Sequence, residues 1–156
     1  MTEKPRVLQA TIREVRTGRN VTLVEPANIY ECSIGDDSFV GPFVEIQRGM
    51  TIGARTKVQP HAFLCELVTI GDDCFIGHGG MFANDTFING GPARGERSLW
   101  RETKIGNRVS IGSNATILPV CICDGAVISA GAEVTRDIEQ DGVYVGSPAR
   151  RIRQLP

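Results

Sequence analysis

Residues 34 to 87 form an uninterrupted series of nine six-residue blocks. Each block begins with a large apolar residue, and its fifth position is small or of modest size in nearly every block. The blocks read IGDDSF, VGPFVE, IQRGMT, IGARTK, VQPHAF, LCELVT, IGDDCF, IGHGGM and FANDTF. An internal repeat of this regularity constrains the fold more strongly than any local propensity does.

A period of six fits neither a helix, whose apolar face repeats at about 3.6 residues, nor an ordinary half-buried strand, whose period is about 2. It fits a short strand followed by a sharp turn, because Gly and Asp, as in Gly35-Asp36-Asp37, supply backbone freedom and local hydrogen bonds. Three such strands per coil make a triangular prism with about 18 residues per coil and about 4.8 Å of rise. The sequence therefore predicts an all-β parallel β-helix in which each coil is stabilised by its neighbours.

Composition limits the class of protein further. A chain of 156 residues makes one domain, residues 1–156, and a net charge of −1 gives no indication of a nucleic-acid or membrane partner. No stretch approaches about 18 apolar residues, and the start, MTEKPRVLQATIREVR, has no apolar signal core. We therefore expect a cytoplasmic protein.

The five cysteines are odd in number and contain no CxxC pair. Cys74 falls at an inward position of its block, where a small apolar side chain fits the core. We expect no disulfide and no metal site.

The repeat is interrupted in three places. Residues 1–20 do not follow the period, and we predict an irregular N-terminal cap over the open end of the prism. Residues 88–103, INGGPARGERSLWRET, form an inserted loop of a length that is usually functional. The repeat resumes at Ile105, and a tail over residues 140–156 leaves the prism through Gly146 and Pro148.

The repeat and the closing run VYVGSPAR resemble the left-handed β-helix hexapeptide acyltransferase superfamily. Within it, FIGHGGMFAND (75–85), the Arg-containing loop and WRET (100–103) resemble the sugar-nucleotide 3-amino N-acetyltransferases of surface-polysaccharide biosynthesis. The resemblance implies a left-handed helix, a homotrimer with active sites between subunits, and acetyl-CoA as donor to the 3-amino group of a nucleotide-linked sugar. One departure is ILPVCI (117–122), which lacks the family's glycine and shortens one corner of the prism.

A polar column is predicted at the root of the inserted loop. Residues 18 apart stack in adjacent coils, so Asn84 lies over Glu66 and Glu66 over Arg48. The resemblance implies that Asn84 hydrogen-bonds the attacking sugar amine, and Glu66 is a candidate to accept its proton. The structural alternatives are a turn-forming Asn and a solvated corner carboxylate.

His61 and His78 are the only histidines, and the repeat places them on adjacent coils. Either is a candidate general base, because an imidazole titrates near neutral pH. The alternative is a surface imidazole packed on Pro60 or Phe75. We expect both histidines to lie near Asn84 and Glu66 beneath the loop.

Coenzyme A needs a flat groove and cations for its phosphates. Gly112, Ser129 and Ala130 allow close approach to the backbone, although tight corners require small residues in any case. Arg136 and Arg150 match basic positions of the resembling superfamily and are candidate phosphate ligands. We expect Trp100 to stack on the nucleotide base of the substrate, or otherwise to pin the loop to a neighbouring subunit.

Two other functions fit the same repeat, and a third fits it poorly. An O-acetyltransferase acts on a hydroxyl, a poorer nucleophile, and would depend on a histidine base. A non-catalytic scaffold is also compatible with the fold. Zinc carbonic anhydrases of the γ type need three His ligands, which two histidines 17 residues apart match poorly.

Overall fold

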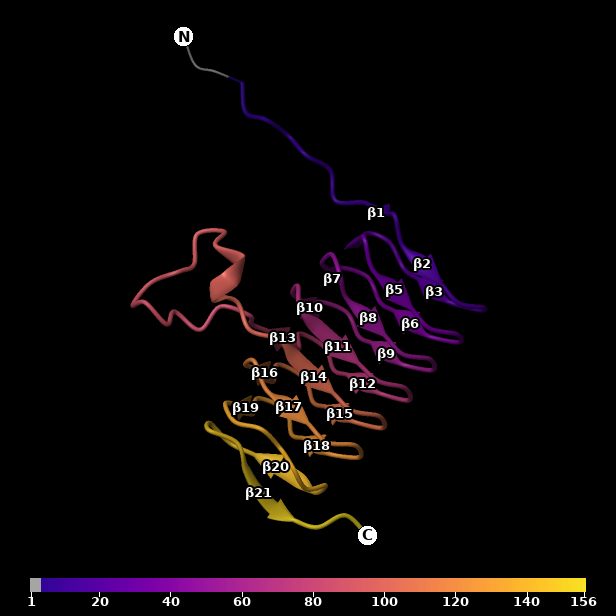
Figure 1. The fold of residues 1–156 in the computed structure, drawn as a ribbon. Helices are drawn as coiled ribbons and strands as arrows, with labels where there is room; N and C mark the ends of the chain where they lie inside the picture. The colour runs from indigo at the N-terminus through magenta and orange to yellow at the C-terminus, as the bar shows by residue number, and fades with distance from the viewer. Residues whose placement is uncertain (1–3) are drawn as a thin grey trace.

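The computed structural model describes residues 4–156 and forms a prism of stacked coils (Figure 1). Three parallel sheets, here called faces 1, 2 and 3, wrap the core in chain order. The corners between them are called edges 1–2, 2–3 and 3–1. Within the described residues the only helix is the 3-10 turn η1 (Arg97–Leu99). The predicted all-β, parallel β-helix is confirmed.

The strands are two to four residues long. Face 1 contains β1 (Ile12–Arg13), β4 (Asn28–Tyr30), β7 (Glu45–Ile46), β10 (Phe63–Leu64), β13 (Met81–Phe82), β16 (Thr116–Ile117) and β19 (Glu133–Val134). Face 2 contains β2 (Arg16–Thr17), β5 (Ser33–Ile34), β8 (Thr51–Ile52), β11 (Val68–Ile70), β14 (Thr103–Ile105) and β17 (Cys121–Ile122). Face 3 contains β3 (Thr22–Leu23), β6 (Phe39–Val40), β9 (Lys57–Val58), β12 (Phe75–Ile76), β15 (Ser110–Ile111), β18 (Val127–Ile128), β20 (Val143–Val145) and β21 (Arg150–Arg153).

The core is a set of apolar ladders. Ile76 of β12 lies opposite Val58 of β9 and Ile111 of β15, and all three side chains are fully buried. Fifth-position residues such as Val44 and Cys74 are buried as well. Both sets point inward because strand residues alternate between core and solvent, and the intervening turn restores the same phase.

Edge 2–3 is held by side chains that bond to the preceding coil. Asp36 Oδ1 accepts the Arg19 backbone N–H at 2.8 Å, and Asp124 Oδ1 accepts that of Asn107 at 2.8 Å. These backbone hydrogen bonds, with side-chain bonds from the same two partners, lower the pKa of Asp36 and Asp124 below the usual carboxyl value. The recurring Asp of the turns is therefore a structural device that links coils.

The first coil begins earlier than expected. Ile12 pairs with Ile29 and Thr17 with Ile34, so residues from Ile12 onward form a regular coil rather than an irregular cap. The first coil does not follow the six-residue period in the sequence, because edge 1–2 has one residue fewer in the two N-terminal coils. Residues 4–9 extend away from the prism and do not cover its end (Figure 1). Residues 1–3 of the proposed cap lie outside the described residues.

The insertion also begins earlier than expected. The last strand before it is β13, and the chain leaves the prism after Asn84 and returns at Thr103, which pairs with Val68. The block FANDTF therefore contributes only its first half to the coil, and Phe87 is 59% exposed. At the other end, β20 continues face 3 in parallel, and β21 returns antiparallel to it after the turn at Gly146 and Pro148.

Replacing a ladder residue should destabilise the prism far more than replacing its neighbour. Ile52 is 2% exposed in the core, whereas Thr51 points to solvent. We expect Ile52→Ala to lower the free energy of unfolding by about 2 to 5 kcal/mol, because it leaves a cavity between coils. Thr51→Ala is the matched control, with an expected change within about 0.5 kcal/mol. Equal losses in chemical denaturation would contradict the assigned inward positions.

The Asp bonds of edge 2–3 predict a loss of stability in acid. Because the folded-state pKa of Asp124 is lowered, its contribution is fully present above the unfolded-state value of about 3.9 and is lost as the pH falls through the folded-state value. Asp124→Asn keeps the acceptor oxygen but does not titrate. Its melting temperature should therefore fall less than that of the wild type between about pH 5 and pH 2.5. The control is Glu139→Gln, at an exposed carboxylate with no hydrogen bond or ion pair among residues 4–156, which should follow the wild-type curve.

Candidate functional site

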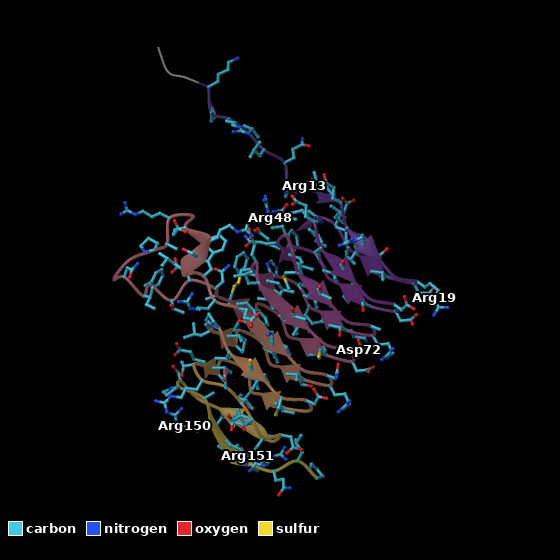
Figure 2. All side chains as sticks on the ribbon, in the orientation of Figure 1. Arg13, Arg19, Arg48, Asp72, Arg150 and Arg151 are labelled. Carbon is cyan, nitrogen blue, oxygen red and sulfur yellow. The ribbon has the colours of Figure 1, made fainter. Side chains whose placement is uncertain are left out.

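A column of polar side chains runs along edge 1–2. Arg48 Nε lies 3.8 Å from Glu31 Oε2 and 3.7 Å from Glu66 Oε1, and Asn84 Nδ2 donates to the Glu66 backbone oxygen at 3.2 Å. Figure 2 shows Arg48 on the prism edge next to the inserted loop. The predicted stack of Asn84 over Glu66 over Arg48 is confirmed.

The inserted loop is tied down at its two ends. The Arg101 N–H donates to the Asn84 backbone oxygen at 2.9 Å, which closes the neck of the loop. Asp85 accepts the N–H of Phe87 at 3.0 Å and that of Ala93 at 2.7 Å. Glu96 caps η1 by accepting hydrogen bonds from the backbone and hydroxyl of Ser98. The loop therefore has a defined shape where it meets the prism.

Glu66 is largely enclosed, with only 12% of its side chain exposed. Its Oε1 faces Arg48, and its buried Oε2 makes no hydrogen bond of ordinary geometry but is ion-paired with the guanidinium of Arg97 from η1. Burial of a charge is tolerated where it is paired in this way. The loop therefore supplies one of the two cations that hold this carboxylate.

These elements enclose a hollow of about 420 Å³ at the root of the loop. It is lined by Gln47, Phe63, Cys65, Glu66, Phe82, Ala83, Asn84, Asp85, Phe87 and Trp100. This lining combines aromatic rings with carboxylate and amide groups, which suits a sugar because a sugar has apolar C–H surfaces and polar hydroxyls. Three of the predicted site residues, Asn84, Glu66 and Trp100, meet in this hollow.

The two histidines lie elsewhere. His61 and His78 occupy successive turns of edge 3–1, as predicted for adjacent coils, since the Gly79 N–H donates to the Pro60 oxygen at 3.0 Å. His61 precedes β10 whereas Glu66 follows it, so face 1 separates the histidines from the hollow within one chain. The prediction that they lie near Asn84 and Glu66 is therefore wrong for a single subunit. Both imidazoles are exposed, and His61 stacks on Phe43 with ring centroids 5.0 Å apart rather than on Pro60 or Phe75.

The small residues proposed for coenzyme A also lie along edge 3–1, in the coils that follow His78. The Asn114 N–H donates to the His78 oxygen at 2.8 Å, and the next turn contains Ser129 and Ala130. A Cβ on Gly112 would lie 2.4 Å from the Ala130 nitrogen, so close packing between coils by itself requires glycine there. Ser129 is half-buried and Ala130 is exposed, so the backbone is accessible along this part of the edge. The run of small residues Gly112, Ser129 and Ala130 is called the coenzyme A strip below, after the ligand expected there.

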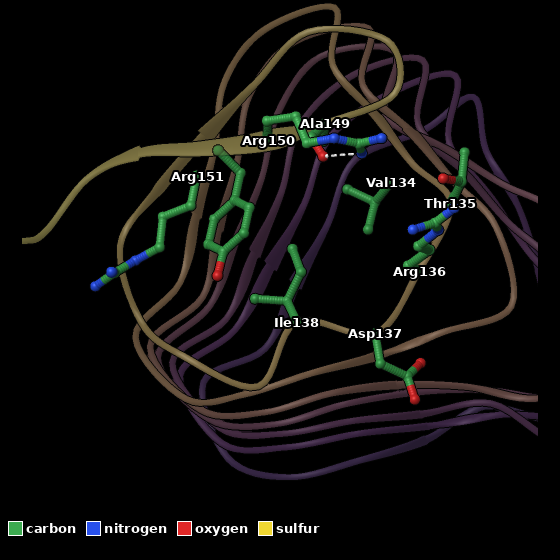
Figure 3. Close-up of a pocket in the computed structure, with 9 residues that line it drawn as sticks. Val134, Thr135, Arg136, Asp137, Ile138, Ala149, Arg150 and Arg151 are labelled. Atoms are coloured by element: carbon green, nitrogen blue, oxygen red, sulfur yellow. Dashed lines mark hydrogen bonds between the residues drawn. The ribbon is translucent and has the colours of Figure 1, made fainter.

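Arg136 and Arg150 lie together at the C-terminal end of the prism, beside a hollow of about 230 Å³ (Figure 3). Arg150 Nη1 donates to the Ala149 oxygen at 2.9 Å, and neither guanidinium forms an ion pair with another residue of the described chain. Arg151 borders the same hollow but points away from it and lies 3.9 Å from Asp141. Two guanidinium groups that form no ion pair within residues 4–156 and border the same hollow are suited to bind a phosphate.

The shortened corner at Leu118–Val120 lies on edge 1–2, directly above the root of the loop, and not beside the small residues of edge 3–1. The missing glycine therefore affects the coil above Asn84. Sequence reasoning did not identify Arg97 as a site residue, because the insertion has no period from which its position follows. It also missed Asp85, because the six-residue pattern assigned that residue to a regular coil. Among residues 4–156, no cluster of three or more His, Cys, Asp or Glu side chains is suited to a metal ion, and no helix has the length and apolarity to span a bilayer.

Comparison with known families identifies the type of repeat. The bacterial transferase hexapeptide model (six repeats) matches residues 102–136, and the hexapeptide repeat of succinyl-transferase matches residues 67–80. The two segments lie on either side of the inserted loop. These two segments of the chain are therefore similar to hexapeptide repeats of bacterial transferases.

Curated relatives include two bifunctional GlmU proteins. That of Streptococcus uberis is 30% identical over 150 residues, covering 95% of this chain and 30% of GlmU. That of Rubrobacter xylanophilus is 36% identical over 121 residues, covering 78% of this chain and 24% of GlmU. This chain thus matches less than a third of the length of either relative.

Solved structures share the fold over nearly the whole chain. A hexapeptide-repeat acetyltransferase from Vibrio cholerae is 25% identical, with a TM-score of 0.58 and coverage of 90% of this chain and 74% of its own. A variant of AntD, an N-acyltransferase from Bacillus cereus solved with dTDP and coenzyme A, is 21% identical, with a TM-score of 0.71 and coverage of 92% and 84%. A hexapeptide transferase family protein from Anaplasma phagocytophilum is 19% identical, with a TM-score of 0.71 and coverage of 91% and 80%.

Cys65 lines the hollow but is not suited to act as a nucleophile. All five cysteines are free, and burial raises the pKa of Cys65 to about 12 and that of Cys32 to about 11. Because the thiolate is the reactive form, we expect Ellman's reagent to label exposed Cys121 first and the buried thiols only on unfolding. Cys121→Ser should remove the fastest phase of labelling in native protein. A fast phase that is lost instead in Cys65→Ser would contradict this assignment.

Proposed function

We propose that this protein is an acetyl-CoA-dependent N-acetyltransferase that acts on the 3-amino group of a nucleotide-linked amino sugar. Support comes from its transferase-type repeats and from its likeness to the Vibrio cholerae acetyltransferase. A variant of AntD, which has the same fold, was solved with dTDP and coenzyme A, so a fold of this kind accommodates a nucleotide and coenzyme A. The proposed setting is cytoplasmic synthesis of a surface polysaccharide.

The observation that carries this proposal is the arrangement of Asn84 and Glu66 at the floor of a hollow roofed by a loop. The Nδ2 of Asn84 is used in its bond to the Glu66 backbone, which leaves Oδ1 as a free acceptor. That oxygen can accept an N–H of a neutral amine and direct the nitrogen lone pair toward a thioester carbon about 3 to 3.5 Å away. Trp100 and Phe87 would hold the sugar or its nucleotide against the wall of the hollow.

The reaction itself needs little from the protein beyond placement. The amine nitrogen attacks the acetyl carbon, the C–N bond forms, and negative charge develops on the carbonyl oxygen. The tetrahedral species then expels the coenzyme A sulfur as the C–S bond breaks. The nitrogen loses one proton, to Glu66 directly or through water, and the departing thiolate takes one up. The backbone N–H of Ala130, which makes no hydrogen bond among residues 4–156, is suited to the developing oxyanion, whereas the Ser129 N–H is donated to the Tyr144 oxygen at 2.9 Å.

We propose that the complete site forms between copies in a homotrimer. The acceptor hollow lies on edge 1–2 and the coenzyme A strip on edge 3–1, and these edges flank face 1. Phe43 and Met81, on or beside that face, are 56% and 45% exposed, so the region has apolar surface to bury. If face 1 turns toward a threefold axis, edge 1–2 of one copy meets edge 3–1 of the next. Arg136 and Arg150 would then bind coenzyme A phosphates.

An O-acetyltransferase is the second candidate, because His61 and His78 lie on the same edge as the coenzyme A strip. In an assembled trimer an imidazole from one copy would approach the hollow of its neighbour, where it could deprotonate a hydroxyl. A scaffold without activity is the third, and the loop-covered hollow with its buried carboxylate argues against it.

The decisive measurement is thiol release from acetyl-CoA with a panel of UDP- and dTDP-linked amino sugars, corrected for the enzyme's own Cys121. For the accepted sugar we expect Asn84→Ala to lower kcat/KM about 100-fold, because the amine loses its orientation. His61→Ala and His78→Ala should each stay within about threefold of the wild type. Loss of turnover in either His variant over a wide pH range, with Asn84→Ala active, would favour the O-acetyltransferase. Absence of thiol release with every sugar of the panel would favour the scaffold.

A site shared between copies predicts complementation. Asn84→Ala removes the acceptor half of a site, and Ala130→Glu blocks the coenzyme A half with a bulky charge on an exposed corner. Each variant alone should be nearly inactive. Refolding them together at equal amounts should restore about a quarter of wild-type activity, because random mixing pairs intact halves at that frequency. Mixing Asn84→Ala with Glu66→Gln, whose defects share one edge, is the control and should restore nothing. Equal recovery in both mixtures would contradict the assignment of the halves to different edges.

A further inference from the structure

The inserted loop has one polar attachment to the prism along its outer part. Residues 86–100 are all described, and within them the Arg97–Glu66 pair is the only ion pair or hydrogen bond that reaches the coils. The remaining bonds of this stretch are local or go to Asp85 at the neck of the loop. Among the described residues, Arg97 is therefore the side chain of this stretch that ties η1 to the coils through a polar contact.

The Arg97 side chain is paired with a buried carboxylate oxygen, so breaking this ion pair is energetically unfavourable. Arg97 is 56% exposed, but the Glu66 oxygen it meets is buried and has no other partner among residues 4–156. If η1 moved away, this oxygen would lose its ion pair, and the carboxylate would keep only Arg48, whose Nε lies 3.7 Å from Oε1. The buried carboxylate thus favours the closed loop until another cation or hydrogen-bond donor replaces the guanidinium.

Arg97 also acts on the aromatic wall. Its guanidinium carbon lies 5.7 Å from the centroid of the Trp100 ring, within the range of a cation–π contact. Trp100 lines the same hollow as Glu66. One arginine therefore touches both the proposed proton acceptor and the ring proposed to hold the nucleotide sugar.

We propose that Arg97 is a positioning residue that latches the inserted loop onto Glu66 and thereby holds Trp100 in the wall of the acceptor site. The expected effect of Arg97 on sugar binding rests on the proposed function, whereas its effect on the position of the loop does not. Because the loop must already be ordered for the sugar to find its binding wall, losing the latch should weaken acceptor binding more than chemistry. The coenzyme A strip on edge 3–1 should be unaffected.

The first test uses Trp100 as a reporter, since it is the only tryptophan. In protein without substrates, Arg97→Gln should increase acrylamide quenching of Trp100 fluorescence about twofold, because the loop opens more often. Arg94→Gln is the matched control: Arg94 is exposed on the same loop and has no ion pair or hydrogen bond among residues 4–156. Arg97→Lys keeps the charge but not the planar fork, and should lie between Arg97→Gln and the wild type. Wild-type quenching in both Arg97 variants would overturn the latch.

A double-mutant cycle tests whether Glu66 is the partner. Glu66→Gln should raise the quenching as Arg97→Gln does, and the double variant should add little, because both remove one interaction. Full additivity would show that Arg97 acts on Trp100 without Glu66 and would overturn the proposal.

The kinetic test follows with the accepted amino sugar. Arg97→Gln should raise KM for the sugar about tenfold, with kcat within about threefold and KM for acetyl-CoA unchanged. An unchanged sugar KM, or an equal rise in both KM values, would overturn the positioning role. If quenching changes as expected but no sugar is turned over, the proposed function fails while the latch stands.

Discussion

The main-chain hydrogen bonds that tie each coil to the next are the interaction on which the rest of this structure depends. They hold equivalent residues of successive coils in register, so a property of one turn is repeated up the whole edge. Ile29, Ile46 and Leu64 stack in this way inside face 1. The same register places Arg48 between Glu31 and Glu66 outside it. A polar column and an apolar ladder are thus two consequences of one pairing pattern.

This register also determines where the fold can accept an insertion. The loop leaves at a corner, after Asn84, and the chain resumes with Thr103 opposite Val68, so the sheets above and below remain paired. A corner already carries side chains that point outward, and here these include a carboxylate that is only 12% exposed. Covering such a group is stable only if its charge is matched. The insertion meets this condition by supplying Arg97, which makes the loop part of the site.

The prism separates two sets of functional candidates that a single chain does not bring together. Asn84, Glu66 and Trp100 lie on edge 1–2, whereas His78 and Ala130 lie on edge 3–1. A coil that turns through three faces fixes this separation rigidly, because short strands and tight corners leave no freedom to bend. Reactants that need both edges therefore need two copies, and assembly becomes part of the proposed chemistry.

The six-residue repeat was enough to predict the β-helix, the inward positions such as Ile76 and Cys74, and the stack of Asn84 on Glu66 on Arg48, because an uninterrupted period converts residue number directly into position. The first coil was missed where five-residue steps at edge 1–2 break that period, as between Ile12 and Thr17. The histidines were misplaced because residues about six apart occupy different edges, so His61 and Glu66 are close in sequence but lie on opposite sides of face 1. The contact between Arg97 and Glu66, by contrast, follows from the folded loop and not from any pattern in the sequence. Residues 85–102 have no repeat, and the partner of a side chain in such a segment is fixed by which buried charge the folded loop happens to cover.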